Sequence, residues 1–404
     1  MHIGMLTRAV VAHGIGGGME IHAETLRRGL TARGHRVTTI TTARADGTPL
    51  IEDAWGATHF VGDGPPATYT AQWWRLTLDR ILAIHRSDPF DVIGGHGKAA
   101  YGYLGARRRL APTDRIPVVA ITHQNIVNDF QALLQQLPRQ TLRFLKWAPS
   151  GVALYADDLR KLPLANVITA PNDLSARALK RWFPVCPDVI EVIPNSVRVT
   201  IFEQASAERA LMRARLQIGD ETRLIVSLAR FERRKGQQYL LEALTRPELR
   251  PYQSQMVVAL AGEGATRAPL ERWVEQRGLK NVARFLGRVP YADVPALLSA
   301  ADIVVYPTLS EGQSLAVLEA MAASRPIVAT SIDANRDVLE DGHSALLVPP
   351  ANAAALARAL VALFDDPACA SELATQAHMR AAATYDEPLM IAGYERAFQH
   401  AATT

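Results

Sequence analysis

Short runs of β-branched and apolar residues alternate with longer helical patterns along nearly the whole chain. The runs at residues 35–42, 118–122 and 166–170 are of the strand type, and stretches with apolar residues at helical spacing separate them. Strands that alternate with helices in this way predict βαβ units and parallel sheets. We therefore expect an α/β protein with doubly wound, Rossmann-like domains.

The length and the pattern together predict more than one domain. The chain has 404 residues, of which 48% are hydrophobic, so two or three domains can each have a full core. A second series of strand patterns follows the turn at 193–196, at residues 222–229, 256–261, 282–286, 302–306 and 326–330. Helical patterns lie near residues 19–33, 237–244, 268–277, 313–323 and 387–402. We expect an N-terminal domain over residues 1–200, a second over 201–384, and a C-terminal helix over 385–404 that crosses back onto the first.

Composition and charge argue against several classes of protein. The 44 basic and 40 acidic residues leave a net charge of only +4, which does not indicate a nucleic-acid binder. Cys186 and Cys369 are too few and too far apart for a disulfide framework or a zinc motif. No apolar run approaches the ~18–20 residues that span a bilayer, and the N-terminus reads as a strand rather than a signal peptide. A cytoplasmic location is expected; interleaved basic and apolar residues over 131–164 leave peripheral contact with the inner membrane face as an alternative.

Gly17 and Gly18 end a glycine-rich turn between the first strand pattern, at residues 2–8, and the helical pattern at 19–33. Glycines at such a turn let backbone amides approach a phosphate, and the start of the helix adds a favourable dipole. Met19 stands where a dinucleotide fingerprint needs glycine, so a nicotinamide site is the weakest interpretation. A phosphate-approaching loop and an ordinary tight turn both fit.

A cationic segment, residues 230–236, follows the strand pattern at 222–229 and precedes a helix. Arg230 offers a planar fork of donors and Lys235 a compact charge, which suits the two phosphates of a diphosphate. A solvated basic loop is the alternative. Ligands of open α/β sheets bind beyond the carboxyl ends of strands, and this position favours a phosphate site.

Two glutamates mark the helical pattern near residues 313–323. Glu319 lies among residues that are otherwise almost all small or apolar, which predicts that this helix is buried. A buried carboxylate needs a polar partner, either a ligand hydroxyl, a cation or a structural ion pair. Glu311 precedes the helix, where it and the free amides of Gly312 and Gln313 are placed to hold sugar hydroxyls.

Two histidines, His96 and His123, each follow a strand pattern and lie where a βα loop enters the expected cleft between the domains. The spacing of histidine, cysteine and acidic residues matches no metal-ligand motif, and there is no Asp-x-Asp pair to hold a divalent ion against a diphosphate. We therefore expect chemistry without a metal.

Taken in order, these motifs resemble those of the retaining glycosyltransferases of family 4, which have the GT-B fold of two Rossmann-like domains facing a central cleft. The matching elements are Gly17-Gly18-x-Glu20, Val192-Ile193-Pro194-Asn195, Arg230 with Lys235-Gly236, and the two glutamates Glu311 and Glu319, separated by seven residues. The resemblance covers nearly the whole chain and is densest over residues 224–349.

The resemblance implies roles for individual residues. Arg230 and Lys235 would neutralise the donor diphosphate, Glu319 would bind the ribose hydroxyls, and Glu311 would bind a hydroxyl of the transferred sugar. His123 would lie near that sugar, and it completes a catalytic set with Glu311, Arg230 and Lys235.

The remaining implied contacts surround this set. Gly17, Gly18, Arg288, Val289, Gly312, Gln313, Ser314 and Leu315 would contact the donor, with Arg288 and Val289 near the nucleotide base. On the acceptor side, the resemblance implies His96 and Glu20.

The function that follows is transfer of a hexose from a nucleotide diphosphate sugar, UDP-linked first and GDP-linked next, to an acceptor hydroxyl. The resemblance implies retained anomeric configuration and no required cofactor or metal, with a carbohydrate, natural-product or lipid-linked acceptor. Two other functions fit the same architecture: a nucleotide-sugar epimerase, and an inactive accessory subunit that binds a nucleotide sugar.

Overall fold

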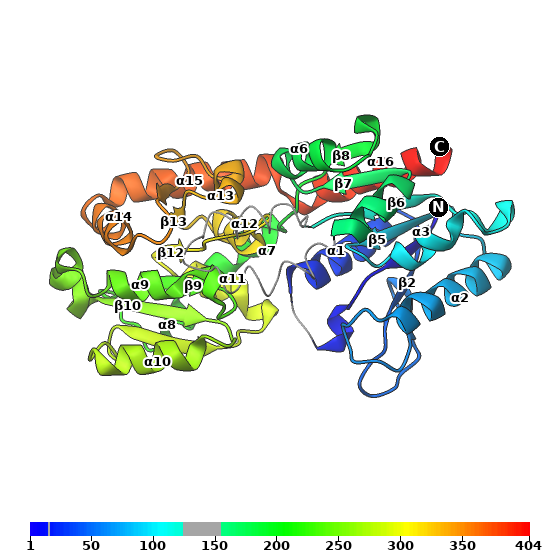
Figure 1. Cartoon of the computed structure of the whole chain (residues 1–404). Helices are drawn as coiled ribbons and strands as arrows, with labels where there is room; N and C mark the ends of the chain where they lie inside the picture. Colours follow the sequence, from blue (N-terminus) through cyan, green and yellow to red (C-terminus); the bar gives the residue numbers. More distant parts are fainter. Residues whose placement is uncertain (15–16, 124–154) are drawn as a thin grey trace. The chain divides into compact units, whose positions relative to one another are not determined.

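The computed structural model describes residues 1–14, 17–123 and 155–404, and the chain divides into two compact units (Figure 1). Unit 1 contains Met1–Asn195 and Pro388–Thr404, and unit 2 contains Ser196–Glu387. The C-terminal helix α16 (Glu387–Thr403) therefore lies almost entirely in unit 1. Most of the segment at 131–164, where membrane contact was considered, lies outside the described residues.

Unit 1 is built on an eight-stranded sheet in the order β3-β4-β2-β1-β5-β6-β7-β8. Its strands are β1 (His2–Leu6), β2 (Arg36–Thr42), β3 (Leu50–Asp53), β4 (Gly56–Val61), β5 (Val92–His96), β6 (Val118–Ile121), β7 (Val167–Ala170) and β8 (Ile190–Val192). All neighbours are parallel except β3 and β4, which form an antiparallel pair at the edge of the sheet. Only two residues join β3 to β4, which suffices for a hairpin but not for the crossover that a parallel pair needs.

Helices of unit 1 cover this sheet and share its core. They are α1 (Gly18–Ala32), α2 (Ala71–Ser87), α3 (Tyr101–Arg107), α6 (Asp173–Trp182) and α16. Leu26 and Leu30 of α1 are fully buried, whereas Ile21 is only half-buried. Tyr394 and Phe398 of α16 belong to the same core as α1 and β1. Residues from the two ends of the chain thus complete one hydrophobic core.

Unit 2 contains a fully parallel six-stranded sheet in the order β11-β10-β9-β12-β13-β14. Its strands are β9 (Arg223–Leu228), β10 (Met256–Ala261), β11 (Ala283–Gly287), β12 (Ile303–Tyr306), β13 (Ile327–Thr330) and β14 (Leu346–Val348). Its helices are α7 (Val199–Gln204), α8 (Arg209–Arg215), α9 (Gln237–Ala243), α10 (Arg267–Gln276), α11 (Val294–Ala300), α12 (Leu315–Ala322), α13 (Asp333–Val338), α14 (Ala353–Asp365) and α15 (Pro367–Thr384). Because the central strands are buried on both faces, they read in sequence as continuous apolar runs.

Each sheet has one switch point, where the strands that follow the first strand along the chain are added on both sides of it. In unit 1 the first strand, β1, lies between β2 and β5, and in unit 2 the first strand, β9, lies between β10 and β12. Open α/β sheets bind ligands beyond the carboxyl ends of the strands at this switch point. The loops that follow β1 and β5 in unit 1, and β9 and β12 in unit 2, are therefore the places where a site is expected.

Helix α12 begins two residues later than the sequence predicted. Ser314 is extended and occupies the N-cap position, so Gln313 and Ser314 belong to the loop after β12. Their amides therefore lie at or before the open N-terminus of α12. Of the helices described, none combines the length and the apolar character required to cross a bilayer.

Candidate active site

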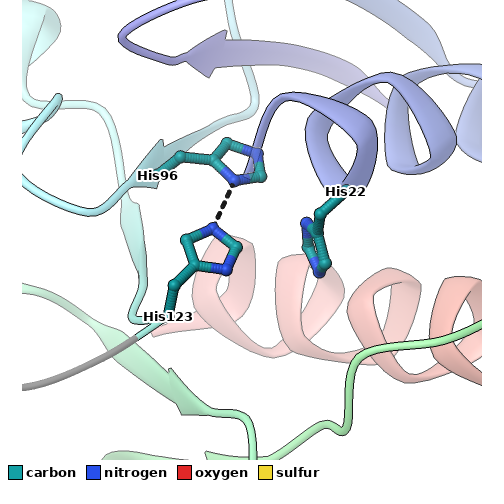
Figure 2. Close-up of side chains that lie close together, drawn as sticks. All are labelled: His22, His96 and His123. Carbon is teal, nitrogen blue, oxygen red and sulfur yellow. Dashed lines mark hydrogen bonds between the residues drawn. The ribbon is translucent and has the colours of Figure 1, made fainter. Parts of the chain in front are cut away.

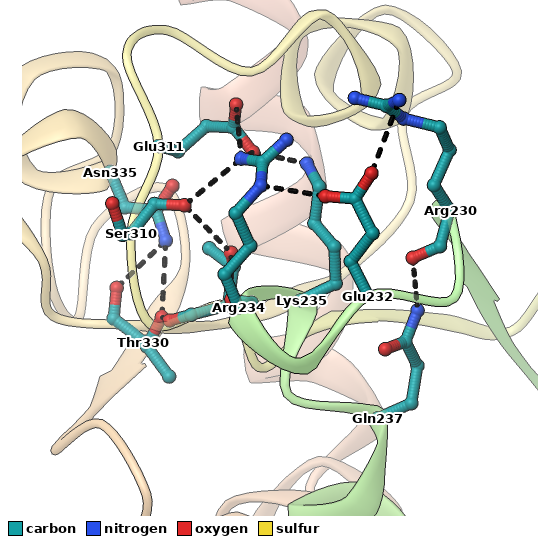
Figure 3. Close-up of polar contacts among 10 residues, drawn as sticks. Arg230, Glu232, Arg234, Lys235, Gln237, Ser310, Glu311, Thr330 and Asn335 are labelled. Carbon is teal, nitrogen blue, oxygen red and sulfur yellow. Dashed lines mark hydrogen bonds and ion pairs between the residues drawn. The ribbon is translucent and has the colours of Figure 1, made fainter. Parts of the chain in front are cut away.

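In unit 2, the loops that follow β9 and β12 are joined by hydrogen bonds to main-chain carbonyl oxygens. The carbonyl oxygen of Arg234 accepts from the Leu309 amide at 2.7 Å and from the Thr308 hydroxyl at 2.9 Å. On the other side, Gln237 of α9 donates to the Arg230 carbonyl at 2.9 Å. The cationic loop is therefore held against the loop that carries Glu311 (Figure 3).

Gly236 makes this close approach sterically possible. Its φ is +69°, in the left-handed region, and a Cβ atom there would overlap the carbonyl oxygen of Pro307 just after β12. A residue with a side chain would be strained in this conformation and would also push the two loops apart. Glycine thus brings Lys235 beside the β12 loop.

The side chains at this junction form a chain of alternating charge (Figure 3). The ammonium group of Lys235 contacts the Glu311 carboxylate, and Arg234 Nη1 lies 3.3 Å from Glu311 Oε2. Arg234 Nε in turn lies 2.8 Å from Glu232 Oε2, and Arg230 Nη1 lies 3.1 Å from Glu232 Oε1. Three cations and two carboxylates leave one net positive charge at the switch point of unit 2.

Burial and charge act in opposite directions on this cluster. Burial alone would raise the pKa of Glu311, but Lys235 and Arg234 outweigh it, so that this pKa lies below its usual value. Burial would lower the pKa of Arg234, but Glu311 and Glu232 raise it above its usual value. The half-buried pair of Arg234 and Glu311 is therefore ionised at neutral pH.

Arg230, predicted as the second phosphate-binding cation, is not the residue that reaches Glu311. Its side chain is 67% exposed and pairs with Glu232, whereas Arg234 pairs with both carboxylates. The sequence did not single out Arg234, because it is one of three consecutive cations, Arg233 to Lys235. The turn that these residues form sets the direction of each side chain.

Glu319 lies in α12 and is buried, as the apolar helix predicted. Burial raises the pKa of this carboxyl to about 7, opposed by a hydrogen bond from the Tyr291 hydroxyl. About half of the molecules therefore carry a protonated Glu319 at pH 7. Tyr291, which follows β11, is a partner that sequence reasoning did not identify.

Other predicted donor residues lie in loops at the same edge of the unit 2 sheet. Arg288 and Val289 follow β11 directly, and the residues Gly312, Gln313, Ser314 and Leu315 lead into α12. Two further glycines, Gly262 and Gly264, follow β10 with φ of +138° and +151°. A Cβ atom at either would press on a carbonyl of the β9 loop, so these glycines allow a third loop to join the site.

In unit 1, Gly17 caps α1 and Gly18 is its first residue. Glu20, predicted for the acceptor side, is buried and forms an ion pair with Arg8 at 2.9 Å. Its carboxylate folds back against Gly17. The helix start predicted to approach a phosphate thus carries its own acidic side chain.

His96 ends β5 and His123 follows β6, and the structure brings them together. His96 Nδ1 lies 3.1 Å from His123 Nε2, and the two rings are nearly parallel. A third histidine, His22 of α1, packs against both, with ring centroids 5.4 Å from His96 and 4.8 Å from His123 (Figure 2). Three separate elements supply these histidines, so their spacing in the sequence gives no sign that they lie together.

Burial keeps these three rings neutral. It lowers the pKa of His123 to about 4, and it lowers the pKa values of His22 and His96 well below their usual range. The one available signal for His22 was its position four residues before Leu26, on the buried face of α1.

A cavity of about 450 Å³ lies at the opposite edge of the unit 2 sheet, where β9, β12 and β13 begin. Arg223 and Arg325 line it, but they already donate to the carbonyl oxygens of Phe364 and Ala323. Because ligands bind at the carboxyl edge of such sheets, this cavity is not the candidate site.

Comparison with known proteins agrees with this architecture. Residues 16–200 match a family described as Glycosyltransferase Family 4, and residues 208–384 match Glycosyl transferases group 1. The D-inositol 3-phosphate glycosyltransferase of Arthrobacter sp. is 28% identical over 380 residues, which cover 91% of this chain and 86% of that protein.

Solved structures share the fold at low sequence identity. Sucrose-phosphate synthase from Thermosynechococcus elongatus superposes with a TM-score of 0.81 at 21% identity and covers 98% of both chains. Anabaena HepE, in complex with UDP and glucose, superposes with a TM-score of 0.75 at 19% identity, also over 98% of both chains.

Two α/β units with these structural neighbours define the GT-B class of glycosyltransferases. The chain belongs to glycosyltransferase family 4, with the family 4 match in unit 1 and the group 1 match in unit 2. The family resemblance and the fold class expected from sequence are therefore confirmed.

Proposed function

We propose that this glycosyltransferase moves a hexose from a nucleotide diphosphate donor, with UDP as the preferred nucleotide, to an acceptor hydroxyl with retention of configuration. The observation that carries the proposal is the ionised cluster of Arg234, Lys235 and Glu311 at the switch point of unit 2. The choice of UDP is supported by the structural similarity to HepE, which binds UDP and glucose.

Without a donor, Glu311 occupies the cations that a diphosphate needs. A donor diphosphate carries more negative charge than one carboxylate, so it competes for Lys235 and Arg234 through charge-assisted hydrogen bonds. Glu311 is then released to accept a hydrogen bond from a sugar hydroxyl. The same exchange would position the sugar and neutralise the diphosphate.

The chemical step places new charge where these cations lie. As the bond from the anomeric carbon to the diphosphate breaks, the leaving oxygen gains negative charge and the sugar gains oxocarbenium character. Preorganised cations stabilise the leaving group, which is why no divalent metal is required at the diphosphate. In our proposal a leaving phosphate oxygen takes the proton of the acceptor hydroxyl, which attacks from the same face and so retains the configuration.

Other residues support binding in this proposal. Glu319 accepts hydrogen bonds from the ribose hydroxyls, and Arg288 and Val289 contact the base. Gly17 and Gly18 approach the diphosphate, and His123 lies near the transferred sugar.

Acceptor recognition is assigned to His96 and Glu20. Two of the similar proteins, D-inositol 3-phosphate glycosyltransferase and sucrose-phosphate synthase, are named after a phosphorylated polyol or sugar. Phosphorylated sugars and polyols therefore come first in the acceptor series that we propose, before natural-product and lipid-linked hydroxyls.

The test combines nucleotide release with product analysis. The full chain is incubated with UDP-, GDP- and ADP-linked hexoses and the acceptor series, and NMR determines the anomeric configuration of the product. We expect acceptor-dependent release of UDP and a product with the donor's configuration. Isomerised donor without any acceptor would indicate an epimerase, and nucleotide-sugar binding without turnover would indicate an accessory subunit; either result would overturn the proposal.

A further inference from the structure

Three imidazoles lie close together in unit 1, two of them buried and the third, that of His123, half-buried (Figure 2). One ring nitrogen from each of His22, His96 and His123 lies within 4.8 Å of the others. The rings come from three elements: helix α1, the end of strand β5 and the residues after β6. The ring of His22 stands nearly perpendicular to the other two, at 74° to His96 and 83° to His123.

One hydrogen bond, between His96 Nδ1 and His123 Nε2, links two of the rings, but it leaves other ring nitrogens of the cluster unaccounted for. Neither ring nitrogen of His22 has a partner within the described residues, and the same holds for Nε2 of His96. Each buried polar atom without a partner costs about 1–3 kcal/mol. His22 and His96 are 3% and 0% exposed, so solvent does not compensate them. His22 can therefore offer a ring nitrogen to a ligand without losing a hydrogen bond to the described residues.

The distances suit a small cation with nitrogen ligands. Zinc–nitrogen bonds are about 2.0–2.1 Å, so neighbouring nitrogens of a tetrahedral site lie roughly 3.3 Å apart. The distance between His96 Nδ1 and His123 Nε2 is already 3.1 Å. A cation between these two nitrogens would replace their hydrogen bond, and it would require the His22 side chain to rotate toward them, which breaks no hydrogen bond to the described residues.

The ligand type selects the class of metal. Imidazole suits late first-row divalent cations such as Zn²⁺, Co²⁺, Ni²⁺ and Cu²⁺, whereas Mg²⁺ and Ca²⁺ prefer oxygen. Neutral imidazole is the form that binds, and each ring then keeps its proton on the other nitrogen. His123 is only partly buried.

We propose that His22, His96 and His123 form a binding site for one late first-row divalent cation, most readily Zn²⁺, with a fourth coordination position left open. Three histidines with an open position is the ligand pattern of some zinc sites that bind a further small molecule. The three histidines belong to unit 1, whereas Lys235 and Glu311 belong to unit 2. This metal site is argued from the histidines alone and does not depend on the proposed donor.

The test measures metal binding and needs no activity. Untagged full-length protein is stripped with a chelator and titrated with Co²⁺ while its visible absorption is recorded. We expect one equivalent of Co²⁺ to give the ligand-field bands of a nitrogen-ligated ion with low coordination number. Addition of Zn²⁺ should remove these bands by displacement.

A matched pair of variants locates the site. His22→Phe should lower the affinity for Co²⁺ by at least about 100-fold, more than the loss of a second-shell partner costs, whereas His343→Phe, at an exposed position, should leave it unchanged. If circular dichroism shows that His22→Phe is unfolded, His123→Gln replaces it. Absence of bands in the wild-type protein, or bands that persist in the folded variant, would overturn the proposal.

Discussion

Donor binding is expected to weaken as the pH falls, because the ribose contact proposed for Glu319 requires its ionised form. Burial raises the pKa of this carboxyl to about 7 in the free protein. Ribose hydroxyls donate hydrogen bonds to a carboxylate but gain less from a protonated carboxyl group. Binding at or below neutral pH must therefore release a proton from Glu319.

The size of the effect follows from this pKa. With a pKa of about 7, half of Glu319 is ionised at pH 7 and roughly 3% at pH 5.5, so the Kd should rise about 15-fold, or about 1.6 kcal/mol. The free protein should show the opposite trend in stability. Because folding raises this pKa, Glu319 stabilises the folded protein fully at pH values below the usual pKa of a carboxyl group. About 3 kcal/mol of this stabilisation is lost as the pH rises through about 7.

Isothermal titration calorimetry with a UDP-sugar can test this prediction. Both phosphates of such a donor are esterified and do not titrate in this range, so the protein supplies the released proton. Wild-type protein should release about half a proton at pH 7, visible as a dependence of the binding enthalpy on the buffer. Glu319→Gln should bind with a nearly constant Kd from pH 5.5 to 8. A pH-independent wild-type Kd, or the same pH dependence in both proteins, would refute the assignment.

Removal of the Lys235 charge by Lys235→Ala should lower kcat about 10²–10³-fold, as loss of one preorganised donor does elsewhere, while the exposed Lys280→Ala retains wild-type initial rates. An unchanged kcat in the first variant would remove Lys235 from the mechanism. In chemical unfolding, Gly278→Ala (φ +67°, open space) should lower the free energy of unfolding by about 1–2 kcal/mol. Gly236→Ala (φ +69°, against a carbonyl oxygen) should lower it clearly more, and equal losses would show that the close approach of Gly236 to Pro307 is unimportant. Phe398→Ala should lower the free energy of unfolding by about 3–5 kcal/mol, and a loss below about 1 kcal/mol would show that α16 is not part of the unit 1 core.

The elements that carry the candidate site were largely predictable from sequence. The strand expected at 222–229 is β9 at Arg223–Leu228, and the one expected at 256–261 is β10. Strands that are buried on both faces must be apolar along their whole length, so they are visible without any knowledge of their neighbours. The same local logic identified Glu319, because one charge in an apolar helix stands out.

Two features were not predicted correctly from sequence: the direction of one strand pair and the first residue of one helix. The antiparallel β3–β4 pair was missed because its strands are short and mostly not buried. The late start of α12 was missed because Gln313 and Ser314 are compatible with either a helix or a loop. In each place the local pattern allowed two conformations, and tertiary packing selected one.

The sequence by itself determined the succession of strands and helices, and with it the fold class and the loops that carry cations and carboxylates. Only the tertiary structure decided that Arg234 rather than Arg230 meets Glu311, and that His22 joins His96 and His123. Periodicity records which face of an element is buried, because it depends on residues a few positions apart. Which side chains meet across elements depends on the order of strands in the sheet and on the turn each loop adopts, and packing of the whole unit sets both.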